Sequence, residues 1–431
     1  MGLFSFFWNL SVRLSLVSCI FLAILPNLPD DLFPSFPFDP VSYEIPATDS
    51  FFNKIKWNSL ISDKSDTLIE SQVVGPESII SKSSYIYTGL GDGRIVAIHK
   101  ENLKVKTLVN LNDPGAGGCG DNVIINTTTC GRPLGLRFGL DGKIYFVDAV
   151  KGLFSFDLET NQLNHLSLGS KSSADYKGFY NDLVFDPKNE DIVYISVTSS
   201  RWTMDSIIWS LLEMRADGFI LSVNLKNGQV NKILTGHRFY NGLEISPDKS
   251  SLLISVTGEF KILKVDLSDI EKSLETGQSV SSVQILINDL PGMPDNIRVF
   301  GNDLYIGLPL LRRNSTIIDN LSTLPKIRKI IGRLSNLIDR FLTLLHEKVY
   351  PHPKLREMSV SFRNGHILHQ AIPSSSGVLI IDANTGKPKR ILGSSTHPSI
   401  SEALLDTSNG DLYLGSYRNN YLLKIKAKDL K

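Results

Sequence analysis

The stretch Asp141-Gly-Lys-Ile-Tyr-Phe-Val-Asp148 joins an Asp-Gly turn to an apolar strand that ends in a polar residue. Asp-Gly favours a tight turn, and the β-branched and aromatic residues after it favour a strand. The same phrase occurs six times, at Gly89–Ile98, Asp141–Asp148, Asp191–Val197, Ser251–Val256, Asp303–Gly307 and Asp411–Gly415. Successive phrases start roughly 50 residues apart, with a gap of about twice that before the last, and this period is typical of four-stranded propeller blades. The sequence therefore predicts an all-β, six-bladed β-propeller.

Hairpins between these phrases supply the other strands of the predicted blades. Gly152–Leu158 is followed by a second strand after Thr160-Asn, and Ile220–Leu225 by another after Asn227-Gly. Each blade would bury its faces against its neighbours, so a single repeat would not be stable alone. We expect three segments: a transmembrane signal-anchor at 1–27, a linker and lead-in at 28–70, and the propeller at 71–431.

The bulk composition is that of a folded globular protein without a strong electric field. The 431 residues are 42% hydrophobic and 21% charged, which is enough apolar material for a full core. The formal net charge is +1, from 45 basic and 44 acidic residues. Such a balance gives no field that would attract a phosphate backbone, so nucleic acid is not expected as a partner.

The N-terminal segment predicts entry into the secretory route. From Leu3 to Leu25 the chain is almost wholly apolar, and about twenty such residues can span a bilayer as a helix. A cleaved signal peptide with Leu14–Leu25 as its apolar stretch is the alternative, but no small-x-small cleavage site follows it. We therefore expect a single-pass type II membrane protein, with the propeller in the endoplasmic reticulum lumen or outside the cell. A secreted protein remains the alternative.

Export changes how the cysteines and asparagines are interpreted. In an oxidising compartment Cys119 and Cys130 are expected to form a disulfide, with two free buried thiols as the alternative. Three acceptor sequons predict N-glycosylation at Asn126, Asn314 and Asn320.

A helical insertion is predicted before the last blade, at residues 311–357. Leu, Ile and Phe recur there at helical spacing among Lys326, Arg328, Lys329, Arg333, Arg340 and Lys348. This basic amphipathic pattern fits a helix on an anionic membrane, a cap over the propeller mouth, or a helix packed on the barrel with a solvated face. The pattern alone leaves all three open.

Four polar residues sit just before apolar strands, where the inner strands of a propeller would bring them together. They are Glu77, Asn181, Asn241 and Asp295. Two carboxylates and two amide oxygens form an oxygen-only set that suits Ca²⁺, whereas Zn²⁺ would require His or Cys. Turn formation by Asn241-Gly and a local backbone bond from Asn181 are the structural alternatives.

Six motifs in order resemble the strictosidine-synthase-like family. They are Gly75-Pro-Glu-Ser, Cys130-Gly-Arg-Pro-Leu-Gly, Val147-Asp-Ala-Val-Lys-Gly, Thr198-Ser-Ser-Arg-Trp, Pro291-Gly-Met-Pro-Asp-Asn-Ile and Leu412-Tyr-Leu-Gly-Ser. The resemblance covers the chain from about Val74 onward and implies an N-terminal anchor, a six-bladed propeller and a glycosylated lumenal part.

The chain is also distantly similar to paraoxonases and related calcium-dependent lactonases. This similarity implies a channel Ca²⁺ held by Glu77, Asn181, Asn241, Asp295 and Asn296. The histidine pair of the paraoxonases is replaced by Leu134 and Ala149, so their proton relay does not carry over. Glu402 lies near the position of the glutamate that strictosidine synthases use, but its register is uncertain and alkaloid synthesis is not expected.

Two functions follow from these expectations. The first is a calcium-dependent arylesterase- or lactonase-type hydrolase, in which Asp295 is both a ligand and the candidate base for a small ester or lactone. The second is a non-catalytic propeller that binds a lipid or another partner and in which Ca²⁺ only holds the blades together. The missing histidines favour the second function.

Overall fold

The computed structural model describes residues 19–33, 36–47, 49–52, 55, 57–113, 119, 126–166, 168, 176–312, 317–371 and 375–430. Most of the predicted anchor and Asn314 lie outside these described residues. Among the described residues, no helix has both the length and the apolar character needed to cross a bilayer.

Six four-stranded antiparallel sheets make up most of the described chain. The first sheet contains β2 (Ile79–Lys82), β3 (Tyr85–Gly89), β4 (Arg94–His99) and β5 (Val105–Asn110). The second contains β6 (Pro133–Phe138), β7 (Ile144–Asp148), β8 (Gly152–Phe156) and β9 (Leu163–Leu166). The third contains β10 (Tyr180–Phe185), β11 (Ile192–Val197), β12 (Phe219–Asn224) and β13 (Val230–Thr235).

The other three sheets follow the same order along the chain, apart from one strand. The fourth contains β14 (Tyr240–Ile245), β15 (Ser251–Val256), β16 (Lys261–Asp266) and β17 (Gln284–Ile287). The fifth contains β19 (Ile297–Phe300), β20 (Asp303–Leu308), β22 (Ser376–Asp382) and β23 (Pro388–Ser394). The sixth contains β24 (Ile400–Leu405), β25 (Leu412–Ser416), β26 (Leu422–Ile425) and β1 (Asp66–Leu68). A small pair, β18 (Gly292–Met293) and β21 (Leu310–Leu311), lies beside the fifth sheet.

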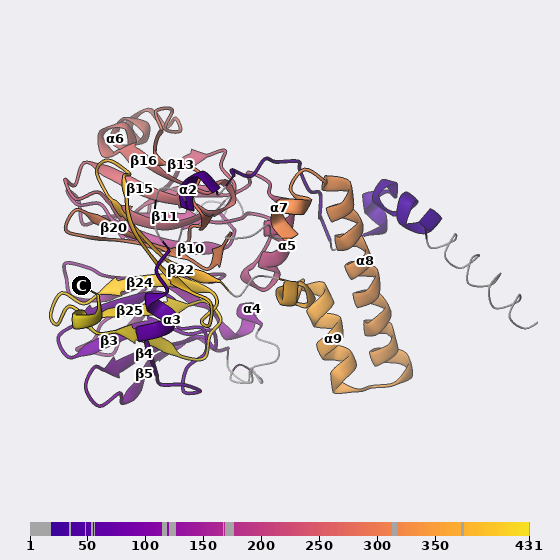
Figure 1. Cartoon of the computed structure of the whole chain (residues 1–431), viewed down its shortest axis with the longest axis horizontal. Helices are drawn as coiled ribbons and strands as arrows, with labels where there is room; N and C mark the ends of the chain where they lie inside the picture. The colour runs from indigo at the N-terminus through magenta and orange to yellow at the C-terminus, as the bar shows by residue number, and fades with distance from the viewer. Residues whose placement is uncertain are drawn as a thin grey trace, which may run out of the picture.

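The first strands of the sheets contact one another in sequence order. Strand β2 contacts β6, β6 contacts β10, β10 contacts β14, β14 contacts β19, β19 contacts β24, and β24 contacts β2. Figure 1 accordingly shows the yellow β24 and β25 beside the violet β3 and β4. The sheets therefore surround a common axis, and the fold is propeller-like.

Strand β1 ties the start of the chain to its end. Leu68 pairs with Leu422 and Asp66 with Lys424 in the sixth sheet. This strand lies before residue 71, so the predicted lead-in contributes a strand to the ring. This pairing joins the segment that leads into the first sheet to the last sheet by backbone hydrogen bonds.

Five of the six sequence phrases form the second strand of a sheet, as β7, β11, β15, β20 and β25. The first phrase instead spans the β3–β4 turn, and its apolar part is a third strand. Apolar side chains fill the spaces between sheets: Ile95 of the first sheet and Leu136 and Phe146 of the second are fully buried in one cluster. Burying each such side chain contributes roughly 1.5–3 kcal/mol.

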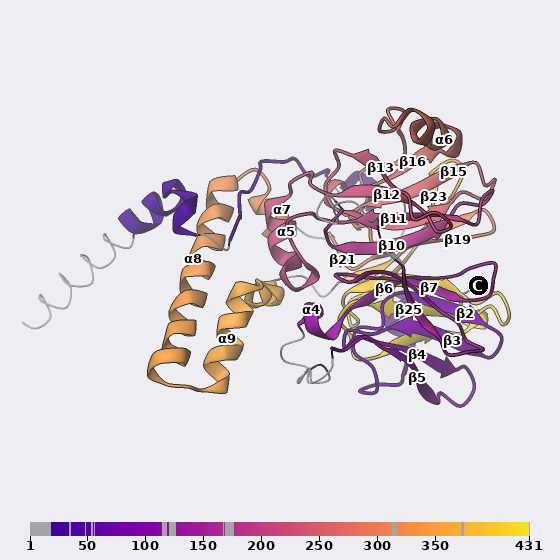
Figure 2. The same cartoon turned by 180° about the vertical axis from the view of Figure 1, so that it is seen from behind.

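The predicted insertion is helical, and it interrupts the fifth sheet between β20 and β22. It contains α7 (Ile317–Leu321), α8 (Pro325–Leu344), the π-helical turn η5 (Leu345–Val349), α9 (Pro353–Arg363) and η6 (His366–Ala371). The helices extend beyond the predicted end at 357, and they account for the double gap between the last two phrases. Figures 1 and 2 show α8 and α9 as a hairpin that projects from one side of the β-structure.

Short helices occupy the remaining connections. They are η1 (Leu25–Asn27), η2 (Asp30–Leu32), α2 (Asp49–Phe52), α3 (Leu60–Lys64), α4 (Thr127–Cys130), η3 (Met204–Ser206), α5 (Ile207–Glu213), η4 (Thr257–Glu259), α6 (Leu267–Thr276) and η7 (Ala427–Asp429). The Pro- and Phe-rich linker packs between α5 and α8, where Phe36 and Phe38 meet Trp202 and Trp209 edge-on.

Candidate metal centre in the channel

The five predicted calcium ligands come from four sheets and are all buried. Glu77 precedes β2, Asn181 lies in β10, Asn241 lies in β14, and Asp295 and Asn296 precede β19. All of them except Asn296 line one cavity of about 80 Å³. This volume is enough for an ion and a few waters.

Irregular strand pairing places the two strand asparagines in this cavity. The register of β10 on β11 shifts between Tyr180 and Leu183, and that of β14 on β15 shifts between Tyr240 and Leu243. A bulge bends the strand and re-aims one side chain, and bulges are common beside functional sites. Asn181 and Asn241 occupy the same position within these two irregularities.

A threonine at the end of each neighbouring strand fixes each amide. Nδ2 of Asn181 donates to Oγ1 of Thr198 at 3.1 Å, and that hydroxyl donates onward to the Tyr240 carbonyl. The fourth sheet repeats this arrangement, because Nδ2 of Asn241 donates to Oγ1 of Thr257, also at 3.1 Å. With its nitrogen held in this way, each amide turns its oxygen away from the threonine.

Four of the ligand oxygens lack a hydrogen-bond partner within the described part of the chain. They are the Oδ1 atoms of Asn181, Asn241, Asp295 and Asn296, and all four are fully buried. A buried polar atom without a partner costs about 1–3 kcal/mol, so native proteins seldom leave several together. Three of these four acceptors belong to residues that line one cavity, and buried acceptors of this kind fit a bound cation that prefers oxygen.

The charge at this site is negative and only partly balanced. Glu77 accepts from Nη2 of Arg132 at 2.9 Å, but burial still raises the pKa of Glu77. Burial also raises the pKa of Asp295 well above its ordinary value, and the charge of Glu77 adds to this effect. Over the described ranges there is no cluster of three or more His, Cys, Asp or Glu side chains at metal-binding separation. The candidate set thus rests on two carboxylates supported by amides.

A second polar layer, which the sequence patterns did not predict, lies next to the ligands. Arg298 donates to Asp182, Ser78 and Glu402, and Arg137 also donates to Asp182. These side chains come from five of the six sheets, and all but Arg137 are buried. Burial raises the pKa of Glu402 to about 7, against the opposing charge of Arg298. The sequence held two signals of this layer: Asp182 directly follows Asn181, and Glu402 lies near the position of the glutamate of strictosidine synthases.

Most of the remaining cavity wall is apolar, apart from Thr257 and Tyr417. Helix α5 contributes Ile207, Ile208 and Leu211, and α7 contributes Ile318. Leu134 and Ala149 form a small buried cluster with Phe179, which also lines the cavity. The two positions predicted to replace the paraoxonase histidines therefore lie in an apolar cluster that reaches the cavity through Phe179.

Comparisons with known proteins place the chain in a family. A model of the strictosidine synthase family matches residues 181–269, which include Asn181 and Asn241. The adipocyte plasma membrane-associated protein of Rattus norvegicus is 30% identical over 303 residues, covering 69% of this chain and 76% of that protein. The chain belongs to the adipocyte plasma membrane-associated protein family.

Another member of that family, from Salmo salar, is 29% identical over 364 residues and covers 83% of this chain and 77% of its own length. Among solved structures, the calcium-binding protein regucalcin from Agrobacterium tumefaciens is similar with a TM-score of 0.49 and 11% identity, over 83% of this chain and 92% of that one. The resemblance to strictosidine-synthase-like proteins is thus confirmed. The family model matches only residues 181–269, whereas the adipocyte plasma membrane-associated proteins match most of the chain.

The predicted disulfide between Cys119 and Cys130 is confirmed in this member of the adipocyte plasma membrane-associated protein family. Asn126 caps α4 by accepting from the Thr128 N–H through Oδ1, and its side chain is exposed. Asn320 is also exposed, on α7. Glycosylation at these two residues and at Asn314 remains a prediction.

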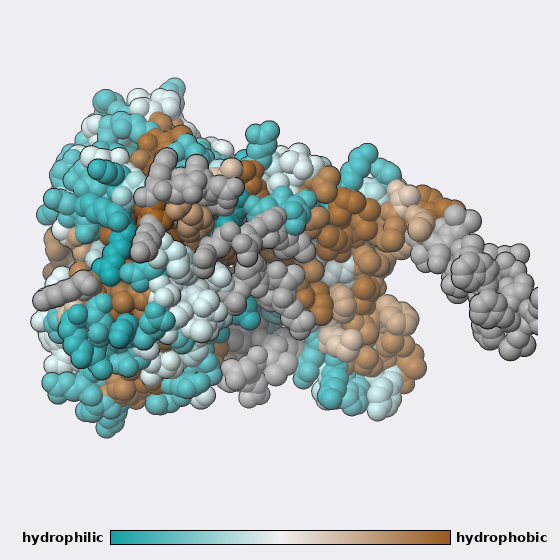
Figure 3. Space-filling view, viewed as in Figure 1, coloured by the Kyte–Doolittle hydropathy of each residue, from teal (hydrophilic) through white to brown (hydrophobic). Residues whose placement is uncertain are grey.

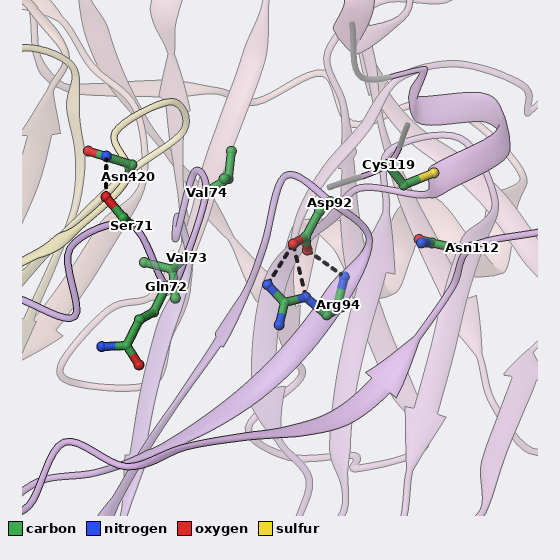
Figure 4. Close-up of a pocket in the computed structure, with 9 residues that line it drawn as sticks. All are labelled: Ser71, Gln72, Val73, Val74, Asp92, Arg94, Asn112, Cys119 and Asn420. Carbon is green, nitrogen blue, oxygen red and sulfur yellow. Dashed lines mark hydrogen bonds and ion pairs between the residues drawn. The ribbon is translucent and has the colours of Figure 1, made fainter. Parts of the chain in front are cut away.

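A second cavity, of about 290 Å³, lies beside the disulfide (Figure 4). Asp92 and Arg94 pair with each other at 2.6 Å on its wall, and Nδ2 of Asn420 donates to Ser71. These charged and amide groups are already satisfied by neighbouring side chains. The channel is therefore the better candidate for a metal centre.

Proposed function

We propose that the chain is a membrane-anchored, six-bladed propeller that binds Ca²⁺ in its channel and hydrolyses small esters or lactones. Each four-stranded sheet corresponds to one blade, in line with the contacts between successive first strands. The observation that carries the proposal is the set of four buried, unpartnered oxygens on Asn181, Asn241, Asp295 and Asn296. Glu77 would complete the ligand set and bring the formal charge to −2.

The chemistry follows from the placement of these side chains. When bound, Ca²⁺ would polarise an ester carbonyl as a Lewis acid. Two carboxylates line the cavity, and Glu77 is bonded to Arg132, so Asp295 is the candidate to accept a proton from an attacking water. Ile208, Leu211 and Phe239 would surround the apolar part of the substrate and exclude bulk water.

Calcium binding is tested on the purified full chain by terbium luminescence and by melting with and without Ca²⁺. We expect Ca²⁺ to raise the melting temperature, and Asp295→Ala to remove this effect. The matched control is Asp92→Ala, which removes a buried carboxylate from the other cavity and should leave calcium binding intact. A calcium response that persists in Asp295→Ala would disprove the ligand set.

Hydrolysis is tested with phenyl acetate and a γ-lactone across a calcium titration. We expect calcium-dependent turnover that Asp295→Ala abolishes. The second candidate function, a non-catalytic propeller, draws on Leu134 and Ala149, because these apolar residues leave Asp295 without a histidine partner. Calcium stabilisation without turnover of either substrate would favour this second function.

The proposed location is a type II membrane protein with its propeller in the lumen or outside the cell. The disulfide and the exposed sequons Asn126 and Asn320 support an oxidising compartment. The names of the relatives, which describe them as plasma membrane-associated, point the same way. N-terminal sequencing of the mature chain separates an uncleaved anchor from secretion after signal cleavage, and a gel shift on deglycosylation tests the sequons.

A further inference from the structure

Helix α8 buries most of its polar side and exposes large apolar side chains. Its buried residues are Arg328, Gly332, Arg333, Ser335, Asn336, Asp339 and Leu342, of which only Leu342 is a large apolar residue. Its exposed residues include Ile327, Leu334, Phe341 and Leu344, and Phe341 is 59% exposed. A helix on a water-soluble surface has the opposite arrangement, with its apolar stripe toward the core.

The exposed apolar residues lie on one face of the helix. Ile327, Leu334, Phe341 and Leu344 follow one another at intervals of seven, seven and three residues, which keeps them on one side. Ile330 and Leu337 fall between them but are half-buried, because they pack against the core cluster that contains Leu25 and Phe33. The stripe continues into η5 and just beyond it, where Val349 is 69% exposed and Tyr350 is 61% exposed.

The polar side of α8 is held by specific bonds within the protein. Arg328 donates to the carbonyls of Leu212, Val41 and Ser322, so its charge faces the protein. Asp339 pairs with Arg363 of α9 at 3.0 Å. These contacts fix the rotation of α8 about its own axis, so the apolar stripe cannot turn inward.

The N-terminal segment joins the same apolar surface. Arg333 of α8 donates to the carbonyls of Leu25 and Leu28 at 2.7 Å each. Just before Leu25, the helical residues Ile20, Phe21, Leu22 and Ile24 are all exposed. Figure 3 shows brown, apolar surface on the helical projection.

We propose that this face, formed by the α8 stripe with Val349 and Tyr350, lies in the interfacial layer of a lipid bilayer beside the N-terminal segment. A helix of this kind can bury its apolar side about 5–10 Å into the boundary of the acyl chains. A second copy of the chain could also cover a stripe with this spacing. The bilayer is favoured because the exposed apolar surface passes from α8 onto residues 20–24, and the sequence from Leu3 to Leu25 is almost wholly apolar.

This docking changes what the basic residues of the insertion do. Arg328 and Arg333 are buried and bonded to backbone carbonyls, so they do not face lipid headgroups. Lys326, Arg340 and Lys348 are exposed, so burial of apolar side chains would bring α8 to the bilayer, and attraction of these three residues to anionic lipid would add to it. The docking would also place α5 and α7, which contact α8 and line the channel cavity, on the membrane side of the ring.

The test uses the full chain in phosphatidylcholine vesicles, with Cys19→Ser as background. A polarity-sensitive NBD label is attached at Phe341→Cys, and separately at Leu140→Cys as the matched control. Leu140 is 88% exposed but lies in the β6–β7 turn, far from α8 in the fold. We expect the label at 341 to shift its emission to shorter wavelength and to be quenched by spin-labelled lipid. The label at 140 should instead be quenched by aqueous iodide.

Three results would overturn the proposal. Equal iodide quenching at 341 and 140 would mean that the stripe faces water. A second result is a label at 341 that is shielded from iodide but not quenched by lipid. If this shielding disappears when the protein is diluted into more lipid, a second copy covers the stripe. Lipid quenching only in vesicles with phosphatidylserine would mean that charge drives the contact. The variant Ile327→Gln, Leu334→Gln, Phe341→Gln, Leu344→Gln should melt in detergent at the wild-type temperature, which shows that the stripe does not hold the fold together.

Discussion

Asn181 and Thr198 form a hydrogen-bonded pair whose geometry fixes which atom of the amide faces the channel. The Thr198 hydroxyl donates its only proton to the Tyr240 carbonyl at 2.7 Å, so it can bond to Asn181 only as an acceptor. The amide nitrogen therefore points to Thr198 and the oxygen points to the cavity. Asn241 and Thr257 repeat the arrangement, with the Thr257 hydroxyl donating to the Pro294 carbonyl.

Replacing both hydroxyls should weaken calcium binding without touching a ligand. In Thr198→Val, Thr257→Val each amide loses its anchor, and outer-sphere changes of this kind typically reduce metal affinity by about 10- to 100-fold. Terbium titration of the purified chain measures the change. The control Thr198→Ser, Thr257→Ser keeps both hydroxyls and should bind like the wild type. Equal affinity in the valine variant would show that the threonines do not orient the ligands.

The disulfide should contribute to stability through the unfolded chain. Cys119 and Cys130 are 11 residues apart, and the closure of so short a loop is worth roughly 2–3 kcal/mol. We expect Cys119→Ser, Cys130→Ser to lower the free energy of unfolding by this amount in a urea titration. Cys19→Ser is the control, since Cys19 is an exposed free thiol. A loss no greater than that of the control would contradict the expectation.

The repeat in the sequence predicted the sheets because their second strands share a local pattern. Asp303–Leu308, for example, is recognisable without any knowledge of its neighbours. Strand β1 was not predicted, because Asp66–Leu68 carries no strand pattern of its own and is defined by its pairing with Leu422–Ile425. That contact joins opposite ends of the chain, and a pattern within a short stretch of sequence cannot predict it.

The candidate ligands could be predicted because each stands immediately before or within the start of an inner strand. The residues that hold these ligands in place could not be predicted from the sequence. Thr198 and Thr257 come directly after β11 and β15, and Arg298 reaches Glu402 and Asp182 only once three sheets face one axis. Periodicity also predicted that α8 is amphipathic, but it could not show that the polar side of this helix is the buried one.

The Arg298–Glu402 pair should hold the fifth and sixth sheets together. Both side chains are buried, and removing one partner of a buried ion pair typically costs about 3–5 kcal/mol. Because Arg298 keeps its pair with Asp182, we expect Glu402→Leu to destabilise the chain by less than about 3 kcal/mol, and Glu402→Leu, Arg298→Met to cost less than the sum of the two single changes. Urea titrations of the four proteins give the coupling energy. Additive losses would mean that the two residues act independently.

Glu259 provides a test of how charge and pH control stability near the channel. Burial alone would raise its pKa, but bonds from His237, Lys261 and the Arg238 N–H outweigh burial and lower the pKa to about 2. The ordinary value is 4.5. Because the folded-state pKa lies below the unfolded one, the ionised carboxylate stabilises the fold above pH 4.5, and this contribution is lost as the pH falls toward 2.

Glu259→Gln should therefore lower the free energy of unfolding at pH 7 by about 2 kcal/mol. The difference from the wild type should shrink between pH 4.5 and pH 2, because the wild-type carboxyl is then protonated as well. Urea titrations at several pH values measure both curves, with Glu275→Gln as the control at an exposed glutamate. A deficit of the same size at every pH would show that Glu259 acts by packing and not through its charge.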